Sequence, residues 1–399
     1  MTRKFKTFLA FSAAALMFSA CNQDKPVKIG AVLPLTGQWE VYGDPIRKGV
    51  ELAAEQLAQD PAQTVAIELD IRDSESNAEN AAAVLEALYA EGALAAVGGV
   101  TTAEALAMIP VVDKKDRVLI SPSATSPRLT GISRTFYRVA PSDFREGAKM
   151  GNYAAQGLQL TKVAIIAAES PYARGIQDVF KSEFERYGGE VPGVVEYPSG
   201  TTEFEPFIDE VLAFEPQAVY VADYAFEIAG IISEIRDKGF KGRILTTHAL
   251  NAPGVFENLG AKAENVLLTQ SVFDVASDDP AVKNFVVAYQ EKYGELPNVF
   301  AAQAYDALGV LASALQNGGR LPNEFQKGMR SLSDFTGASG AIQFDEKGDV
   351  GKFPRVYAFE GGQLVDFEKR TKERLEELKR RMEEIKRRQR EEARRQNTG

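Results

Sequence analysis

The sequence predicts an α/β protein with two doubly wound parallel-sheet lobes and a charged C-terminal helix. Short β-branched strands alternate with helical runs of about 10–15 residues, which is the pattern of right-handed βαβ units. The pattern restarts at Lys162, so the strands form two successive sets. The 399 residues, 45% of them hydrophobic, suffice for two or three domains with large cores.

An export signal precedes the fold at residues 1–20. Three basic residues come before an apolar stretch over 8–18, which is too short to span a bilayer, since that takes about 20 residues. The only cysteine, Cys21, ends a segment that resembles a bacterial lipobox, where the cysteine is acylated and becomes the mature N-terminus. The alternative is an ordinary secretory signal with an incidental cysteine. We expect an exported lipoprotein, anchored to a membrane and facing the periplasm or the cell exterior.

The first set of strands begins with a buried strand at Val27–Leu33. A helix is predicted from Asp44, a good N-cap, with Pro45 at its first helical position. The elements that follow alternate: a strand at 67–71, a helix over 77–91, a strand at 95–98, a helix from Thr102 and a strand at 118–121.

The second set begins with a strand at 163–166. Its other predicted elements are a helix after Ala173 and strands at 191–197, 218–222, 243–245 and 266–269. Ligands of such sheets bind beyond the carboxyl ends of the strands, so residues directly after a strand are candidates for a site.

The chain continues after the second set. Amphipathic helices are predicted over 285–293 and 300–315, and a polar turn at 344–349. The segments 354–359 and 363–365 flank Gly361-Gly362, which predicts a hairpin.

Charge and motifs exclude several classes of function. Residues 22–367 hold 30 basic and 48 acidic residues, and a body this acidic repels the phosphates of nucleic acids. One cysteine and one histidine exclude an intramolecular disulfide and a Cys/His zinc cluster. No Gly-x-Ser-x-Gly, Walker or Gly-x-Gly-x-x-Gly motif is present. We therefore predict no enzyme, no catalytic residue, no metal and no cofactor.

Five segments in order resemble the type I periplasmic binding proteins, and more specifically the leucine/isoleucine/valine-binding branch of ABC-transporter substrate-binding proteins. The resemblance covers about 27–367. The segments are Ile29–Gly37 followed by Tyr42-Gly43, Ile120–Thr125, Ala164–Ile166 with Tyr172, Ala304–Ala307, and Phe344–Asp349.

The resemblance implies two lobes that are joined by three hinge crossovers and close on a ligand between them. Lobe 1 would comprise 27–143 and 272–350, and lobe 2 would comprise 144–271 and 351–367. The partners it implies are a small carboxylate or amino-acid ligand and an ABC permease.

In lobe 1 the family's ligand contacts correspond to Thr102, Ser123, Ala124 and Thr125, which would hold a carboxylate and an amino group. The chemistry agrees, because a buried carboxylate needs donors such as short hydroxyls and amides at a helix N-terminus. The alternative is that Thr102 only caps its helix, while Ser123 and Thr125 satisfy a turn.

Aromatic residues correspond to further pocket positions of the family. Tyr172 and Tyr224 match positions in lobe 2, Tyr42 and Phe300 match positions in lobe 1, and Trp39 would line the rim. Aromatic side chains give large contact area with few rotatable bonds. The alternative is ordinary core packing.

His248 departs from the family pattern, in which an acid at this position commonly pairs with the ligand's ammonium group. Asp223 is the nearest candidate to replace that acid. This departure bears on the identity of the ligand more than on the resemblance to the family.

Residues 368–399 form a charged helical tail outside the fold, with 13 basic residues against 8 glutamates. Four apolar residues spaced 3, 4 and 3 make a seam of two heptads, which is short for a coiled coil. A solvated single helix is one interpretation. Self-association, and contact with anionic headgroups or an acidic partner, are the others.

The function predicted is that of a solute-binding lipoprotein of an ABC importer, which binds a small carboxylate, foremost a branched-chain amino acid. One alternative ligand is an aromatic or short-chain carboxylic acid without an ammonium group. A different class of function is a regulatory envelope lipoprotein on the same fold that transports nothing.

Overall fold

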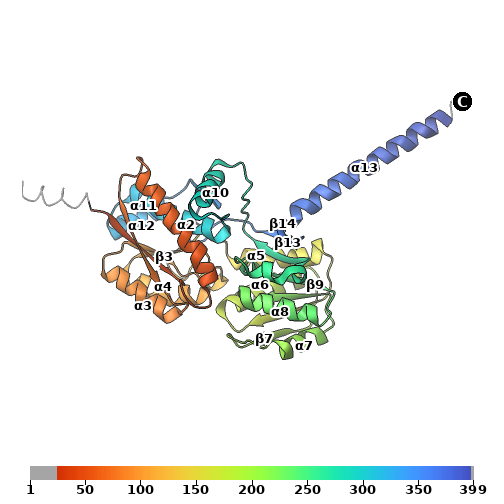
Figure 1. Cartoon of the computed structure of the whole chain (residues 1–399), viewed down its shortest axis with the longest axis horizontal. Coiled ribbons are helices and arrows are strands. Elements are labelled where there is room, and N and C mark those ends of the chain that lie inside the picture. Colours follow the sequence, from red (N-terminus) through yellow and green to blue (C-terminus); the bar gives the residue numbers. More distant parts are fainter. Residues whose placement is uncertain (1–24, 397–399) are drawn as a thin grey trace, which may run out of the picture. The chain divides into compact units, whose positions relative to one another are not determined.

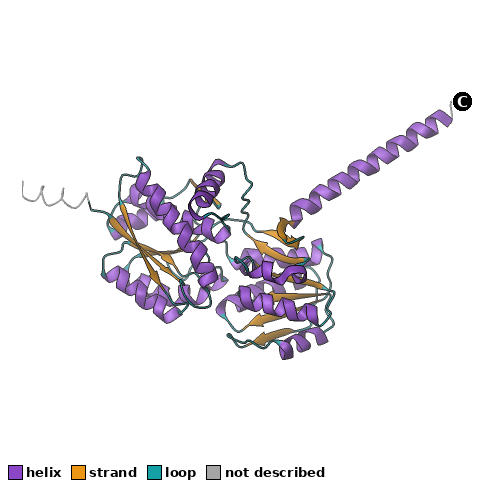
Figure 2. Cartoon of the chain, in the orientation of Figure 1, coloured by secondary structure: helices purple, strands orange, loops and turns teal. Residues whose placement is uncertain are grey.

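The computed structural model describes residues 25–396, apart from the side chains of Glu257 and 391–396. The predicted export signal and Cys21 lie outside these residues. The chain forms two compact units (Figure 1). Unit 1 comprises the described residues up to Phe144, Ser170–Gly175 and Ser271–Phe353, and unit 2 comprises Arg145–Glu169, Ile176–Gln270 and the chain from Pro354. Both contain helices around a sheet (Figure 2), which confirms the predicted α/β class.

Unit 1 is built on a five-stranded sheet in the order β2-β1-β3-β4-β5, and all of its strand pairs are parallel. Its central strands β1, β3 and β4 are apolar and buried except at Lys28, as parallel sheets with helices on both faces require. The strands are β1 (Val27–Leu33), β2 (Ile67–Asp73), β3 (Ala95–Gly98), β4 (Val118–Ser121) and β5 (Phe136–Arg138).

Helices from both ends of the chain cover this sheet. The helix α11 (Val299–Gly318) lies against α2 (Glu40–Gln59), and Gly49 permits the close approach, since a Cβ atom there would lie 2.2 Å from the carbonyl oxygen of Ala301. The remaining elements of unit 1 are α3 (Ala78–Ala90), α4 (Thr102–Lys115), η1 (Pro127–Leu129), α10 (Pro280–Tyr293), α12 (Pro322–Arg330) and the two-stranded β11 (Phe335–Gly337) and β12 (Gly340–Ile342).

The predicted start of the second element was wrong. Helix α2 begins at Glu40, so Pro45 lies inside the helix and not at its first position. Pro45 is the sixth residue of the helix, beyond the four N-terminal positions whose N–H groups lack partners within the helix, so it removes one backbone hydrogen bond, to the carbonyl of Val41. The additional turn places Tyr42 on the buried face of the helix.

Unit 2 contains a seven-stranded sheet in the order β14-β13-β10-β9-β8-β6-β7. The five strands from β7 to β10 are parallel, and β13 and β14 are antiparallel. The strands are β6 (Val163–Ala168), β7 (Val194–Tyr197), β8 (Ala218–Ala222), β9 (Arg243–Thr247), β10 (Val266–Gln270), β13 (Arg355–Glu360) and β14 (Gln363–Asp366). The helices are α5 (Asp143–Asn152), η2 (Tyr153–Gly157), α6 (Pro171–Arg186), α7 (Glu205–Ala213), α8 (Ala225–Asp237), η3 (His248–Leu250), α9 (Val255–Leu259), η4 (Gly260–Ala263) and α13 (Phe367–Gln396).

The predicted hairpin is confirmed, because β13 and β14 pair antiparallel around Gly361 and Gly362. Both glycines have positive φ angles, 58° and 77°, as a two-residue turn of this kind requires. The chain then enters α13 directly.

The first turn of α13 is bound to the rest of unit 2. Glu368 accepts hydrogen bonds from the Nζ of Lys149, at 2.6 Å, and from the backbone N–H of Val356, at 3.1 Å. Arg370 also pairs with Glu360. Among the described residues, no helix combines the length and the apolar character needed to cross a membrane.

Candidate functional site

Most of the predicted contacts of unit 1 lie at one edge of its sheet. Strands β1, β3 and β4 are parallel neighbours, so their carboxyl ends meet at this edge. The segments that follow these three ends carry, in turn, Trp39 and Tyr42 at the start of α2, Thr102 at the start of α4, and Ser123–Thr125 in a loop.

Thr101, and not Thr102, caps helix α4. The Thr101 hydroxyl accepts a hydrogen bond from the Glu104 N–H, at 3.2 Å, and the Glu104 carboxylate accepts one from the Thr101 N–H, at 3.0 Å. This is a complete capping box. Thr102 is 1% exposed, and its hydroxyl has no hydrogen-bond partner among the described residues. The capping alternative for Thr102 is therefore not supported by the geometry.

The loop after β4 is held by its own side chains. The Ser121 hydroxyl donates to the Gly99 carbonyl, at 2.8 Å, and accepts from the Ala124 N–H, at 2.9 Å. Ser123 donates to the Val100 carbonyl, at 2.7 Å, which brings this loop against the start of α4. A serine hydroxyl that donates its proton in this way still offers its lone pairs to another donor.

Thr125 and Ser126 are held by two further contacts. The Thr125 hydroxyl donates to Asp143, at 2.9 Å, and the Ser126 carbonyl accepts from the Nη1 of Arg138, at 2.9 Å. Arg138 is fully buried and also binds both carboxylate oxygens of Asp349, at 2.7 and 2.9 Å. This ion pair fixes the loop that carries three of the predicted contacts.

Two of the aromatic residues predicted to contact the ligand, Tyr42 and Phe300, touch each other in unit 1. The rings of Tyr42 and Phe300 meet edge to face with centroids 5.2 Å apart, and both side chains are buried. Trp39 is half-buried just before α2, and its backbone N–H donates to the Ser76 hydroxyl, at 3.1 Å.

Tyr172 lies in the first turn of α6 and is 3% exposed. Its segment, Ser170–Gly175, groups with unit 1, whereas the sequence analysis assigned Tyr172 to the second lobe. Within this grouping, the Ser126 hydroxyl donates to the Pro171 carbonyl, at 3.1 Å.

The predicted contacts of unit 2 follow two neighbouring strands, β8 and β9. Asp223 and Tyr224 come directly after β8, and His248 directly after β9. Tyr224 is half-buried at the start of α8, and the other two side chains are buried.

Asp223 is already engaged within unit 2. It accepts a hydrogen bond from the Tyr197 hydroxyl, at 2.6 Å. Burial raises the pKa of Asp223 to about 7, although the bond from Tyr197 opposes the shift. Near neutral pH this carboxyl is thus protonated in part of the molecules, which weakens it as a partner for a cation.

His248 has an acidic partner that the sequence analysis missed. Its Nδ1 lies 2.8 Å from the Oε2 of Glu146, and the Glu146 side chain is 2% exposed. The two residues are 102 positions apart, and nothing in the sequence around Glu146 distinguishes it from other helical glutamates.

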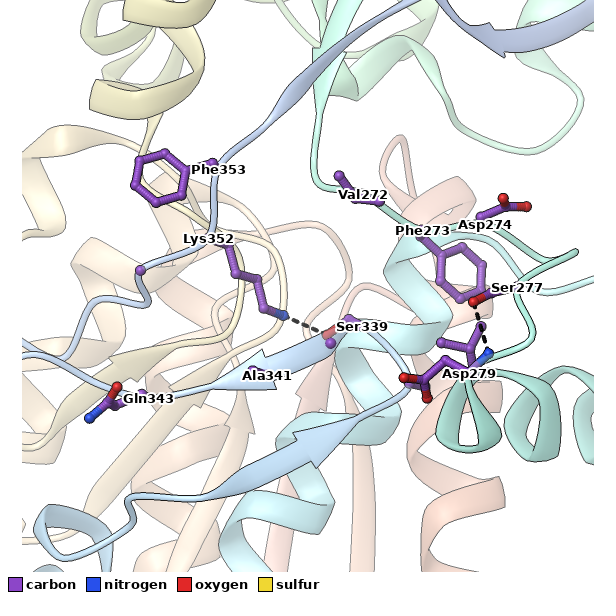
Figure 3. Close-up of a pocket in the computed structure, with 14 residues that line it drawn as sticks. Val272, Phe273, Asp274, Ser277, Asp279, Ser339, Ala341, Gln343, Lys352 and Phe353 are labelled. Atoms are coloured by element: carbon purple, nitrogen blue, oxygen red, sulfur yellow. Dashed lines mark hydrogen bonds between the residues drawn. The ribbon is translucent and has the colours of Figure 1, made fainter. Parts of the chain in front are cut away.

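A separate pocket of about 550 Å³ lies in unit 1 (Figure 3) and contains none of the predicted contacts. Lys352 points into it and donates from Nζ to the Ser339 hydroxyl, at 2.6 Å. Burial lowers the pKa of Lys352 to about 8, and Asp306 opposes the shift. Burial likewise raises the pKa of Asp306 to about 6. The negative charge of Asp306 offsets the positive charge of Lys352, so a ligand in this pocket does not need a charge of its own to neutralise the lysine.

Comparison with known proteins identifies a family whose model matches most of this chain. A family model described as "Periplasmic binding protein" matches residues 26–359. The Leu/Ile/Val-binding protein homolog 3 of Brucella melitensis is 24% identical over 376 residues, which are 92% of this chain and 100% of that protein.

Two solved structures have the same fold. A leucine-binding protein, LivK, from Thermotoga maritima has 31% identity and a TM-score of 0.80, over 85% of this chain and 97% of the other. A solute-binding protein of an R. palustris ABC transporter, in complex with benzoate, has 19% identity and a TM-score of 0.78, over 86% and 96% of the two chains.

Proposed function

The chain belongs to the periplasmic binding protein family, and from this premise we propose that it binds an α-amino acid with an apolar side chain and delivers it to an ABC permease. Members of this family are exported solute-binding proteins and not enzymes. One observation carries the proposal. The Thr102 hydroxyl is buried and has no hydrogen-bond partner within residues 25–396, beside a threonine that already caps the helix. Leaving such a group unpaired costs free energy, and a ligand carboxylate at the helix N-terminus would remove that cost.

Unit 1 can supply both kinds of hydrogen-bonding group that an amino acid needs. Thr102 is the donor for the carboxylate. Ser123 and Thr125 donate their own protons to the protein, so their oxygens serve as acceptors for an ammonium group. Ala124 contributes backbone between Ser123 and Thr125. The rings of Tyr42 and Phe300 provide an apolar wall.

Unit 2 supplies the charge. Glu146 is a stronger candidate than Asp223 for the acid that meets the ammonium group, because Asp223 is engaged by Tyr197 and its pKa is raised. A neutral His248 that donates from Nδ1 to Glu146 would orient the carboxylate and leave its negative charge in place. Tyr172, Tyr224 and Trp39 stay candidates for apolar contact with the ligand.

We expect Thr102→Val to weaken leucine binding by roughly a hundredfold, since removing one partner of a buried charged group costs a few kcal/mol. Thr102→Ser keeps the hydroxyl and should lose less than about fivefold. Isothermal titration calorimetry on both variants checks this, with circular dichroism to verify the fold. Equal affinities in Thr102→Val and the wild type would remove Thr102 from the site.

An aromatic or short-chain carboxylic acid without an ammonium group is the second candidate ligand. The observation in its favour is His248 at the position where the family commonly has an acid, and a relative of the same fold was solved with benzoate. A thermal-shift panel of branched-chain amino acids and simple organic acids separates the two, because a ligand that binds the folded state raises the melting temperature. A protein that responds to neither class would fit the regulatory alternative.

We also propose that Cys21 anchors the protein through lipid. We expect Cys21→Ser to release the protein from the membrane fraction or to leave it unprocessed, because the thiol that accepts the lipid is gone. Cell fractionation with immunoblotting and intact-mass analysis measure both outcomes. A processed variant that stays in the membrane fraction would contradict lipid anchoring at Cys21.

A further inference from the structure

Helix α13 carries a row of exposed apolar side chains. Leu375, Leu378, Met382 and Ile385, here called the tail seam, are 49–56% exposed. Every described side chain from Lys369 to Arg390 is exposed, and the helix extends outward from β14 (Figure 1). Four apolar residues at spacings of 3, 4 and 3 lie on one face of a helix, as the a and d positions of a coiled coil do.

The charges beside the tail seam are all positive. With Leu375 and Met382 at position a, both flanking positions, e and g, hold only basic residues. They are Lys372, Lys379 and Lys386 at e, and Arg374, Arg381 and Arg388 at g. The glutamates lie elsewhere, as in Glu377 and Glu384, which pair with Arg381 and Arg388 along the helix. The basic residues therefore line the seam on both sides.

This arrangement disfavours pairing between two copies of the tail. In a parallel pair the g position of one helix meets the e position of the other, so Arg381 would face Lys386 of the second copy. In an antiparallel pair, e meets e and g meets g, and these contacts are again between like charges. Repulsion on both sides opposes a seam of only two heptads.

The width of the seam disfavours a membrane surface. Helices that lie in a lipid interface present a broad apolar face. The tail seam occupies two positions in seven, the narrow stripe typical of helix–helix contact. The same turns hold Glu376, Glu377, Glu383 and Glu384, which anionic headgroups would repel.

We propose that the tail seam binds an amphipathic helix of a partner protein, whose own apolar a and d residues are flanked by carboxylates. The basic residues at e and g then meet acids on both sides of the seam, which selects the partner by charge. Contact over two heptads is short, so the interaction is weak on its own and depends on salt.

The test uses the full mature chain with Cys21→Ser and a synthetic acidic peptide with leucine at a and d and glutamate at e and g. Fluorescence anisotropy should show saturable binding at 50 mM NaCl that weakens at 500 mM. Leu378→Gln keeps helix propensity and should abolish binding, because it puts an amide into the seam. Lys379→Glu with Lys386→Glu should weaken binding by about tenfold or more.

Arg380→Glu with Arg387→Glu is the matched control. It makes the same change in net charge at position f, opposite the seam, and should weaken binding less than about twofold. Equal losses in the two double variants would show general attraction between opposite charges and overturn the proposal. No saturable binding by a chain whose α13 is intact by circular dichroism would also overturn it.

Two further measurements address the other occupants of the seam. Sedimentation equilibrium should show a monomer, and a dimer that Leu378→Gln dissociates would assign the seam to a second copy. Flotation with vesicles of phosphatidylcholine and phosphatidylglycerol should recover little protein. Strong recovery that Leu378→Gln abolishes would assign the seam to a membrane.

Discussion

Glu146→Gln should lose at least a hundredfold of the affinity for leucine. An ammonium group that leaves water needs a charged or strongly accepting partner, and removing a buried charged partner costs about 3–5 kcal/mol. Glu146 is buried, it is a carboxylate, and its hydrogen bond with His248 orients it. Glutamine keeps the size of the side chain, removes the charge and replaces one acceptor oxygen with an NH2 donor, so titration calorimetry measures the loss of the carboxylate without a change in packing volume.

Asp223→Asn is the matched control for this result, since it makes the same acid-to-amide change within unit 2. Its effect on leucine binding should be smaller, because Asp223 accepts from Tyr197 and has a pKa of about 7. His248→Ala should cost less than about tenfold, since it removes only the group that orients Glu146. If Asp223→Asn loses more affinity for leucine than Glu146→Gln does, then Asp223 and not Glu146 is the acid that meets the ammonium group. If the ligand lacks an ammonium group, Glu146→Gln should be harmless.

Arg138→Met should lower the free energy of unfolding by about 3–5 kcal/mol, because it leaves the carboxylate of Asp349, only 12% exposed, without its cation. Arg138 is fully buried and makes hydrogen bonds to Asp349, Ser126 and Thr130. Urea denaturation followed by circular dichroism measures the change. Ligand affinity should fall as well, since Arg138 fixes the loop that carries Ser123–Thr125.

Arg72→Met provides the comparison on the surface. Arg72 pairs with Asp70 and Glu91, but its side chain is 28% exposed, so the loss should stay within about 1 kcal/mol. Adding Asp349→Leu to Arg138→Met should recover much of the lost stability, because the unpaired charge is removed. Equal effects of Arg72→Met and Arg138→Met would contradict the special cost of the buried pair.

The parts of the fold that were predictable have a local cause. Strands such as Val163–Ala168 are short β-branched runs, and Gly361-Gly362 prescribes its own turn. The start of α2 was missed because Asp44-Pro45 has the form of a helix start, while the actual start at Glu40 has no side-chain cap. Local signals predict where an element begins only when tertiary packing favours the same start. In α2 it does not, because the earlier start brings Tyr42 onto the buried face of the helix.

The residues of the candidate site likewise divide into those that have a local signal in the sequence and those that depend on tertiary packing. Position after a strand, together with the resemblance to the family, nominated Thr102, Ser123 and His248. It could not show that Thr101 provides the cap, since both threonines suit that role equally in the sequence. Nor could it identify Glu146, because its contact with His248 joins residues far apart in the chain. Such pairs depend on the register of whole elements, which no local pattern encodes.

The pairing of β10 with β13 has a consequence for how the chain folds. Gln270 pairs with Arg355, and the intervening residues, up to Phe353, belong to unit 1. The β13–β14 edge of the unit 2 sheet therefore waits until a long stretch of the other unit has left the ribosome or the export channel. Closing so long a loop costs entropy before any contact repays it, which slows folding. Unit 1 likewise needs α11 to cover α2, so a fragment that ends at Gln270 should complete neither unit.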